Sequence, residues 1–395
     1  MLENKTARYT MFGSLYFSQG TVFAYFTALN ALYFLSRGLT MADVGVFGAI
    51  ALIPFVIKVF LGMLSDRVNL FGMGHRKPYI LLGLVIQAIC LVLVSFIDPA
   101  QYYWGFVAIA FTLQMGMALY DTCTDGLALD TTPKDEQGTI QGFMVGGRAA
   151  GVVLTASVLG WLAQEVSWTA VFWLMAVLTL IPVPLVLSVR EEERSESRDF
   201  EWSAFAAFKQ KSIIALAVAG FLFFMVIAGA NQNVNPFLEA EFGISLQTAG
   251  LFTTLWGLGV VIGGLFGGRL ISRVGQQTST RIAIFFSFVA ILVVGMIPSP
   301  GFAWPIVAVF GLAYGTYQTV YFALAMRYTD TRIAASMFSI FMAVTNIGQG
   351  VGFALAGGLA NSSAVGFRWT FVILTLFNLV ALPLLPVIFK KRAAA

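Results

Sequence analysis

The chain has 395 residues, of which 58% are hydrophobic and 11% are charged. A soluble fold of this length could not hide so many apolar side chains in its core, so the composition excludes an ordinary soluble protein and favours a membrane protein. The net charge is +4, and the basic residues are spread along the chain rather than gathered in one patch, which argues against nucleic acid as a partner.

Apolar runs long enough to cross a bilayer recur along the whole sequence. About 20 helical residues cross roughly 30 Å of hydrocarbon, so we expect an all-α membrane protein with twelve transmembrane helices. The first run is too long for a signal-peptide core, and we expect it to stay in the mature protein. The runs cover residues 10–35, 42–64, 78–97, 103–129, 139–163, 167–189, 212–236, 247–271, 279–297, 302–327, 333–358 and 367–389.

Lysine and arginine are sorted between the two sides of the membrane. If the N-terminus is cytoplasmic, 19 of the 23 basic residues fall in the tails and alternate loops of that side, whereas the opposite side holds only Arg37 and Arg368. This asymmetry follows the positive-inside rule. We therefore expect both termini in the cytoplasm and a multi-pass protein of the cell inner (plasma) membrane.

The chain reads as two similar halves joined by a polar linker. Residues 190–211 form the long polar stretch, which separates an N-terminal bundle at 1–189 from a C-terminal bundle at 212–395. Residues 38–40 (GLT) correspond to 243–245 (GIS). An even number of helices per half gives both halves the same orientation, as in parallel repeats around a central site.

A glycine-rich and basic loop follows the second run. It holds residues 62–67 (GMLSDR) and, after a seven-residue spacer, residues 75–78 (HRKP). This pattern resembles the signature loop of the major facilitator superfamily, with a longer spacer than in sugar and drug carriers. The resemblance implies two six-helix bundles, and it assigns a role in latching the cytoplasmic gate to Asp66, Arg67, Arg76 and Lys77.

Three further segments narrow the resemblance. Residues 16–20 (YFSQG), 53–58 (IPFVIK) and 70–72 (LFG) are similar to the folate-biopterin transporters. The spacing from Pro54 to Lys58 also resembles acetyl-coenzyme A transporters and muropeptide permeases. This closer likeness lies within residues 14 to 150, so it implies an organic solute without naming it.

Among the ionisable residues inside the apolar runs, four stand out: Lys58, Asp121, Asp125 and Arg148. A charge near the bilayer centre costs roughly 2.5 to 3.5 kcal/mol, so each needs a partner or a water-filled cavity. Helix rise places Lys58, Asp121 and Arg148 roughly 12 to 14 Å from the cytoplasmic boundary. The aspartates are four residues apart, which puts both carboxylates on one helix face.

Two interpretations of these charges are open. They could be a structural ion-pair cluster, or they could be a coupling and solute site. For coupling, a proton would bind Asp121 or Asp125, because burial and nearby cations shift carboxyl affinity in opposite senses. Sodium is the alternative ion, since paired carboxylates and amides also bind it. For the solute, Lys58 and Arg148 would attract a carboxylate or phosphate.

The second half offers polar groups of other kinds. Amides precede Pro236, which loosens the helix around it, and tyrosines three and four residues apart form one face of the tenth run, although such stripes also serve as packing. The resemblance implies that the first, fourth, seventh and tenth helices line the cavity. The predicted solute-binding residues are Lys58, Arg148, Gln19, Tyr25, Asn231, Gln232, Asn235, Tyr317, Gln318 and Tyr321.

Signals of enzyme chemistry are missing from the sequence. The two cysteines, Cys90 and Cys123, lie inside apolar runs without metal-ligand spacing. No phosphate-binding glycine loop, nucleophile elbow or nucleotide fingerprint is present. We therefore expect no catalytic residue, no metal and no cofactor.

Together these features predict a secondary transporter that works by alternating access. The expected solute is organic, anionic and similar to a pteridine or folate, and the expected mode is proton symport by a monomer in the lipid bilayer. The alternatives are a proton-coupled exporter working by antiport and a non-transporting membrane assembly factor. Retained charges at mid-membrane depth argue against the last, because a scaffold does not need them.

Overall fold

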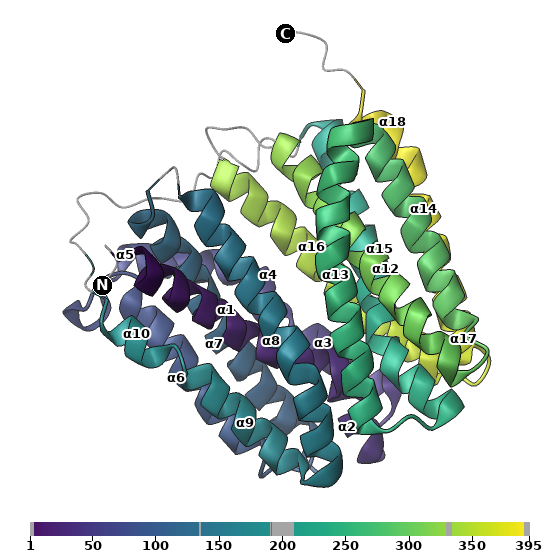
Figure 1. Cartoon of the computed structure of the whole chain (residues 1–395), viewed down its shortest axis with the longest axis horizontal. Coiled ribbons are helices and arrows are strands. Elements are labelled where there is room, and N and C mark those ends of the chain that lie inside the picture. The colour runs from purple at the N-terminus through teal and green to yellow at the C-terminus, as the bar shows by residue number, and fades with distance from the viewer. Residues whose placement is uncertain (1–3, 134–135, 190, 192–208, 329–333, 391–395) are drawn as a thin grey trace. The chain divides into compact units, whose positions relative to one another are not determined.

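The computed structural model describes residues 4–133, 136–189, 191, 209–328 and 334–390, and in this part of the chain every regular element is a helix (Figure 1). Internal contacts divide the chain into two units. The first unit takes the described residues of 1–38, 51–200 and 245–254, and the second takes those of 39–50, 201–244 and 255–395.

The first unit is built on two pairs of long helices. Helix α1 packs along α8, and α6 packs along α7, with α9 beside α6 (Figure 1). Ser167 starts α9 because its side chain accepts a hydrogen bond from the backbone N–H of Ala170, which satisfies one free donor of the first turn. The helices are α1 (Lys5–Ala28), α2 (Asn30–Ser36), α4 (Ile53–Val56), α5 (Lys58–Arg67), η1 (Leu70–Gly72), α6 (Lys77–Val94), α7 (Tyr103–Thr131), α8 (Gln137–Glu165), α9 (Trp168–Leu180) and α10 (Val183–Leu187).

The second unit repeats this plan with other helices. Helix α12 packs along α16, and α14 packs against α15 and α17. Gly243 ends α12 in the left-handed conformation (φ +62°), which glycine adopts without steric cost. The first nine residues of α13 belong to the first unit, as does Ala51 of α3. The helices are α3 (Met41–Ala51), α12 (Lys211–Phe242), α13 (Leu246–Val274), α14 (Gln276–Gly295), α15 (Pro300–Tyr328), α16 (Ala334–Asn361), α17 (Gly366–Val380), η3 (Leu382–Leu384) and α18 (Leu385–Ile388).

Helices lie at each of the predicted apolar runs. Among the described residues, 11 helical stretches are long and apolar enough to cross a membrane. The remaining run, 10–35, folds as α1 and α2 but is not one of the 11, so the count of twelve and the sidedness of the termini stay predictions. The predicted halves also stay predictions, and most of the linker at 190–211 lies outside the described residues.

Glycines set the close approach of α1 and α8. A Cβ on Gly147 would lie 2.2 Å from the carbonyl oxygen of Gly13, and one on Gly20 would lie 2.1 Å from the carbonyl oxygen of Arg148. The backbones are therefore too close for any side chain, as in small-residue contacts of membrane helices. A Cβ on Gly142, on the same helix as Gly147, would have no atom of the described residues within 4 Å.

The predicted run over 42–64 is one of the 11 candidate spans, at Met41–Arg67, but its helix is interrupted. Helix α3 ends at Ala51, α4 occupies only Ile53–Val56, and α5 starts at Lys58. Pro54 stands in the first turn of α4 and has no N–H to continue the ladder of α3. Residue Ile57, with φ −93° and ψ 2°, separates α4 from α5. Lys58 is thereby the first residue of a helix.

Candidate functional site

Lys58 and Asp121 form an ion pair inside the first unit. The Lys58 ammonium donates a hydrogen bond to Oδ2 of Asp121 at 3.1 Å, and the Gln19 amide donates to Oδ1 of the same carboxylate at 2.7 Å. The side chains of Lys58 and Asp121 are 21% and 10% exposed. Helices α1, α5 and α7 therefore converge on one carboxylate.

Asp125 lies one turn further along α7 and has a different partner. The hydroxyl of Tyr16 on α1 donates a hydrogen bond to its Oδ1. Asp125 is half-buried, and the charges of Asp121, Lys58 and Arg148 all act on it. The sequence drew attention to Tyr16 only as part of a family-like segment. Its spacing of three residues from Gln19, on one face of α1, was the available signal.

Arg148 lies on α8, and its charge acts on the same group of residues. Its guanidinium carbon stands 5.1 Å from the centre of the Phe23 ring, a cation–π contact with α1. The side chain is exposed. Within the described part of the chain, no carboxylate oxygen lies within 4.0 Å of the Arg148 guanidinium nitrogens, so Arg148 forms no ion pair there. We call Tyr16, Gln19, Lys58, Asp121, Asp125 and Arg148 the charge cluster.

Tyr25 lies apart from the charge cluster. Its ring is 4% exposed and packs edge-on against Phe172 of α9, with centroids 5.3 Å apart. Its buried hydroxyl has no hydrogen-bond partner among the described residues. The structure therefore places Tyr25 in aromatic packing between α1 and α9.

The predicted amides of α12 connect that helix to α16. The Gln232 amide donates to the carbonyl oxygen of Phe353 at 3.2 Å. Asn233, which is not one of the predicted residues, donates to the carbonyl oxygen of Ala356 at 3.2 Å. Asn231 is half-buried and Asn235 is buried. These contacts are the helix cross-links that amides form in membranes.

The tyrosine face of α15 is packed against α12. Tyr317 and Tyr321 are each 3% exposed. The Tyr317 ring centre lies 3.8 Å from that of Phe223, and the Tyr321 hydroxyl lies where a Cβ on Gly220 would be. Gln318 is half-buried. Both rings are therefore packed against α12, and their role in solute binding stays a prediction.

Of the four predicted gate residues, Asp66 and Arg76 pair with each other. The Arg76 guanidinium donates to the Ser65 hydroxyl at 2.6 Å and to Asp66 at 2.5 Å, and its Nε lies 3.7 Å from Asp130 of α7. Arg76 is 6% exposed, whereas Arg67 is exposed. Arg76 therefore ties α5, the start of α6 and the end of α7 together.

Lys77 and Glu191 connect the start of α6 to the end of α10 and the residues that follow it. We call this group of contacts the Glu191 cap. The Glu191 carboxylate accepts hydrogen bonds from the backbone N–H groups of His75 (2.8 Å), Arg76 (2.9 Å) and Lys77. In return the Lys77 ammonium donates to the carbonyl oxygens of Leu187 and Val189. A negative group at one helix start and a positive group at another helix end both suit the helix dipoles.

A third ionic group joins the start of α1 to the start of α8. Glu136 accepts from Arg8 and, at 3.0 Å, from the Tyr9 hydroxyl, and Lys5 pairs with its other oxygen at 2.5 Å. The hydrogen bond from Lys5, together with the nearby charge of Arg8, lowers the pKa of Glu136 below its usual range. The carboxylate therefore stays ionised at neutral pH.

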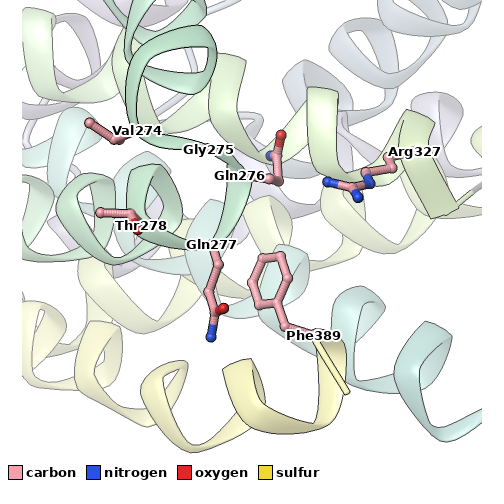
Figure 2. A pocket seen from close by; sticks show the side chains of 7 residues that line it. All are labelled: Val274, Gly275, Gln276, Gln277, Thr278, Arg327 and Phe389. Atoms are coloured by element: carbon pink, nitrogen blue, oxygen red, sulfur yellow. The ribbon is translucent and has the colours of Figure 1, made fainter. Parts of the chain in front are cut away.

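A shallow pocket of about 380 Å³ lies in the second unit, at the turn between α13 and α14 (Figure 2). Figure 2 shows the Arg327 side chain directed toward the start of α14. The distribution of basic residues predicts a cytoplasmic position for this turn. The lining residues are Val274, Gly275, Gln276, Gln277, Thr278, Arg327 and Phe389.

A family profile described as Major Facilitator Superfamily matches residues 11–352 of the chain. The chain belongs to this superfamily. The resemblance inferred from the loop at 62–78 is thereby confirmed. The chain is therefore a multi-pass membrane protein of a transporter family and is not an enzyme.

Curated superfamily members similar to this chain carry different solutes. The sialic acid transporter NanX of Escherichia coli is 24% identical over 68% of this chain and 67% of its own length. The folate-biopterin transporter of Synechocystis is 24% identical over 72% of this chain and only 58% of its own length. The anhydromuropeptide permease of Escherichia coli is 23% identical over 84% of this chain and 68% of its own length. Two of the predicted subgroups are therefore among the relatives.

Solved superfamily structures share the fold of this chain. A variant of the nucleoside transporter NupG superposes with a TM-score of 0.82 at 17% identity, covering 97% of this chain and 100% of that one. A D-xylose-proton symporter gives a TM-score of 0.74 at 17% identity, covering 99% of both chains. At this identity the likeness establishes the major facilitator fold alone.

Proposed function

We propose that this protein carries an organic anion across the inner (plasma) membrane together with a proton, by alternating access and as a monomer. The charge cluster is the observation that carries the proposal. Two carboxylates, one lysine and one arginine lie within apolar helices of the first unit, and Gln19 and Tyr16 hold the carboxylates in place. Such groups are expensive in a membrane and mark solute or ion pathways.

The arrangement suits symport of an anion better than a purely structural role. A structural ion pair satisfies its charges internally, as Lys58 and Asp121 do. Arg148 is exposed and its described contact is with an aromatic ring, so a guanidinium is available to a carboxylate or phosphate. The names of two relatives, sialic acid and folate transporters, also describe carboxylic acids.

Flux into proteoliposomes tests this function. The purified full-length chain is reconstituted, an inwardly directed proton gradient is imposed, and uptake of radiolabelled sialic acid, folate, biopterin and an anhydromuropeptide is followed. We expect at least one acid to accumulate above its external concentration, and an uncoupler to abolish the accumulation. Empty liposomes and an Arg148→Gln variant serve as controls, and the variant should not accumulate the acid.

Other outcomes would replace the proposal with a specific alternative. Accumulation that follows a sodium gradient and ignores pH would assign sodium as the coupling ion. Uptake only when the proton gradient is reversed would assign antiport and export. Absence of flux for every acid, with correctly folded protein in the membrane, would favour a non-transporting assembly factor.

A further inference from the structure

We propose that Asp125 is the carboxyl that carries the proton, that Tyr16 positions it, and that Asp121 stays ionised as the partner of Lys58. This division rests on the proposed function and deepens it. It also defines the solute, because the charges left over by the Lys58–Asp121 pair suit a monoanion that moves with one proton.

Asp121 is already committed to other donors. Its Oδ2 accepts from the Lys58 ammonium at 3.1 Å and its Oδ1 accepts from the Gln19 amide at 2.7 Å. Protonation would set an O–H against one of these donors and leave the Lys58 charge, only 21% exposed, without its counter-charge. A buried ammonium without a partner is costly, so the ion pair opposes protonation of Asp121.

Asp125 has no such commitment. Its one described hydrogen bond comes from the uncharged hydroxyl of Tyr16 to Oδ1, and within the described residues its Oδ2 has no donor. Asp125 is half-buried, so a proton can reach it. The charged or titratable groups that face it are Asp121 on its own helix, Lys58 on α5, Tyr16 on α1 and Arg148 on α8.

The charge balance links proton and solute. Lys58 and Asp121 cancel each other, which leaves the negative Asp125 and the positive Arg148. A proton on Asp125 leaves one uncompensated positive charge, and charge at this depth is unfavourable. Binding of a monoanion at Arg148 removes it. The proton therefore raises the affinity for the anion, and by linkage the anion raises the affinity for the proton.

Infrared difference spectroscopy on the purified full-length protein tests the assignment without knowledge of the solute. A protonated carboxyl has a carbonyl stretch that its ionised form lacks. The chain has 19 acidic residues, so several such bands appear as the pH is lowered, and we expect the Asp125 band as a difference between the wild type and Asp125→Asn. Asp125→Asn should abolish the band, and Tyr16→Phe should keep it but move it to higher pH by about one unit, the worth of one hydrogen bond to a charged group.

The matched control removes the other carboxyl without leaving a lone buried charge. In the double variant Lys58→Met with Asp121→Asn, the band should remain. Loss of the band in this double variant with retention in Asp125→Asn would overturn the assignment, as would loss in both or the absence of any difference between the wild type and Asp125→Asn. These outcomes concern only the proton site. Failure of the flux assay with a band that behaves as expected would instead reject the proposed solutes.

Discussion

The ammonium of Lys58 donates to the carboxylate of Asp121 across 3.1 Å and so connects the first residue of α5 to the middle of α7. Removing one partner of a mostly buried ion pair leaves an uncompensated charge, which costs about 3–5 kcal/mol. We expect Lys58→Met to lower the melting temperature of the detergent-solubilised protein clearly. The double variant with Asp121→Asn should recover most of the loss, and equal melting of single and double variants would contradict a direct pair.

Gly126 on α7 leaves the space that the Arg76 guanidinium occupies. A Cβ there would lie 2.6 Å from both Cζ and Nε of Arg76, so Gly126→Ala should push the guanidinium off Asp66 and Asp130. We expect a loss of about 1–3 kcal/mol in stability, the usual cost of overpacking, measured as thermal unfolding. Gly105→Ala on the same helix is the control, because its Cβ would meet only an atom at 3.8 Å.

Glu191 holds three backbone N–H groups at the start of α6. Neutralising this cap in Glu191→Gln should destabilise the first turn of α6 by about 1–2 kcal/mol. Hydrogen exchange read by mass spectrometry should then be several-fold faster in peptides covering His75 to Lys77. Glu239 is an exposed glutamate on α12, and Glu239→Gln should leave that exchange unchanged. Unaltered exchange in Glu191→Gln would show that Glu191 does not stabilise the start of α6.

Glu136 gives a stability contribution that depends on pH. Its pKa is lowered in the folded protein by the Lys5 hydrogen bond, so the unfolded chain binds the proton more tightly. The contribution is therefore fully present above the ordinary carboxyl value of about 4.3 and is lost as pH falls through the lower folded value. We expect Glu136→Gln to melt earlier than the wild type at pH 7.

The same comparison at low pH completes this test. Below the folded pKa of Glu136, both proteins carry an uncharged group at this position, so their melting temperatures should converge. A difference that persists unchanged from pH 7 into strong acid would show that the variant acts through packing rather than charge. Lys5→Met should follow the same pH dependence, because it removes the first cause of the shift.

The sequence predicted the four charged members of the charge cluster because helical periodicity indicates depth and facing direction. Asp121 and Asp125 share a face through their spacing, and counting residues from the helix ends brought Lys58 and Arg148 to the same depth. The partners Tyr16 and Glu191 were not assigned to a site, because contacts between segments more than 100 residues apart leave no trace in periodicity. Tyr317 shows a second limit, because the spacing of the tyrosines predicts one face of the helix but not which neighbouring helix packs against it.

The short break at Ile57 makes the position of Lys58 sensitive to chain length. Each residue in a helix turns the next side chain by about 100° around the axis. An insertion between Leu52 and Lys58 that restored a continuous helix would therefore swing the lysine toward another neighbour, although composition and hydropathy would barely change. The direction of the Lys58 side chain is thus set by the break at Ile57. A homologous chain with a continuous helix here would need its lysine at another sequence position to present the cation in the same place.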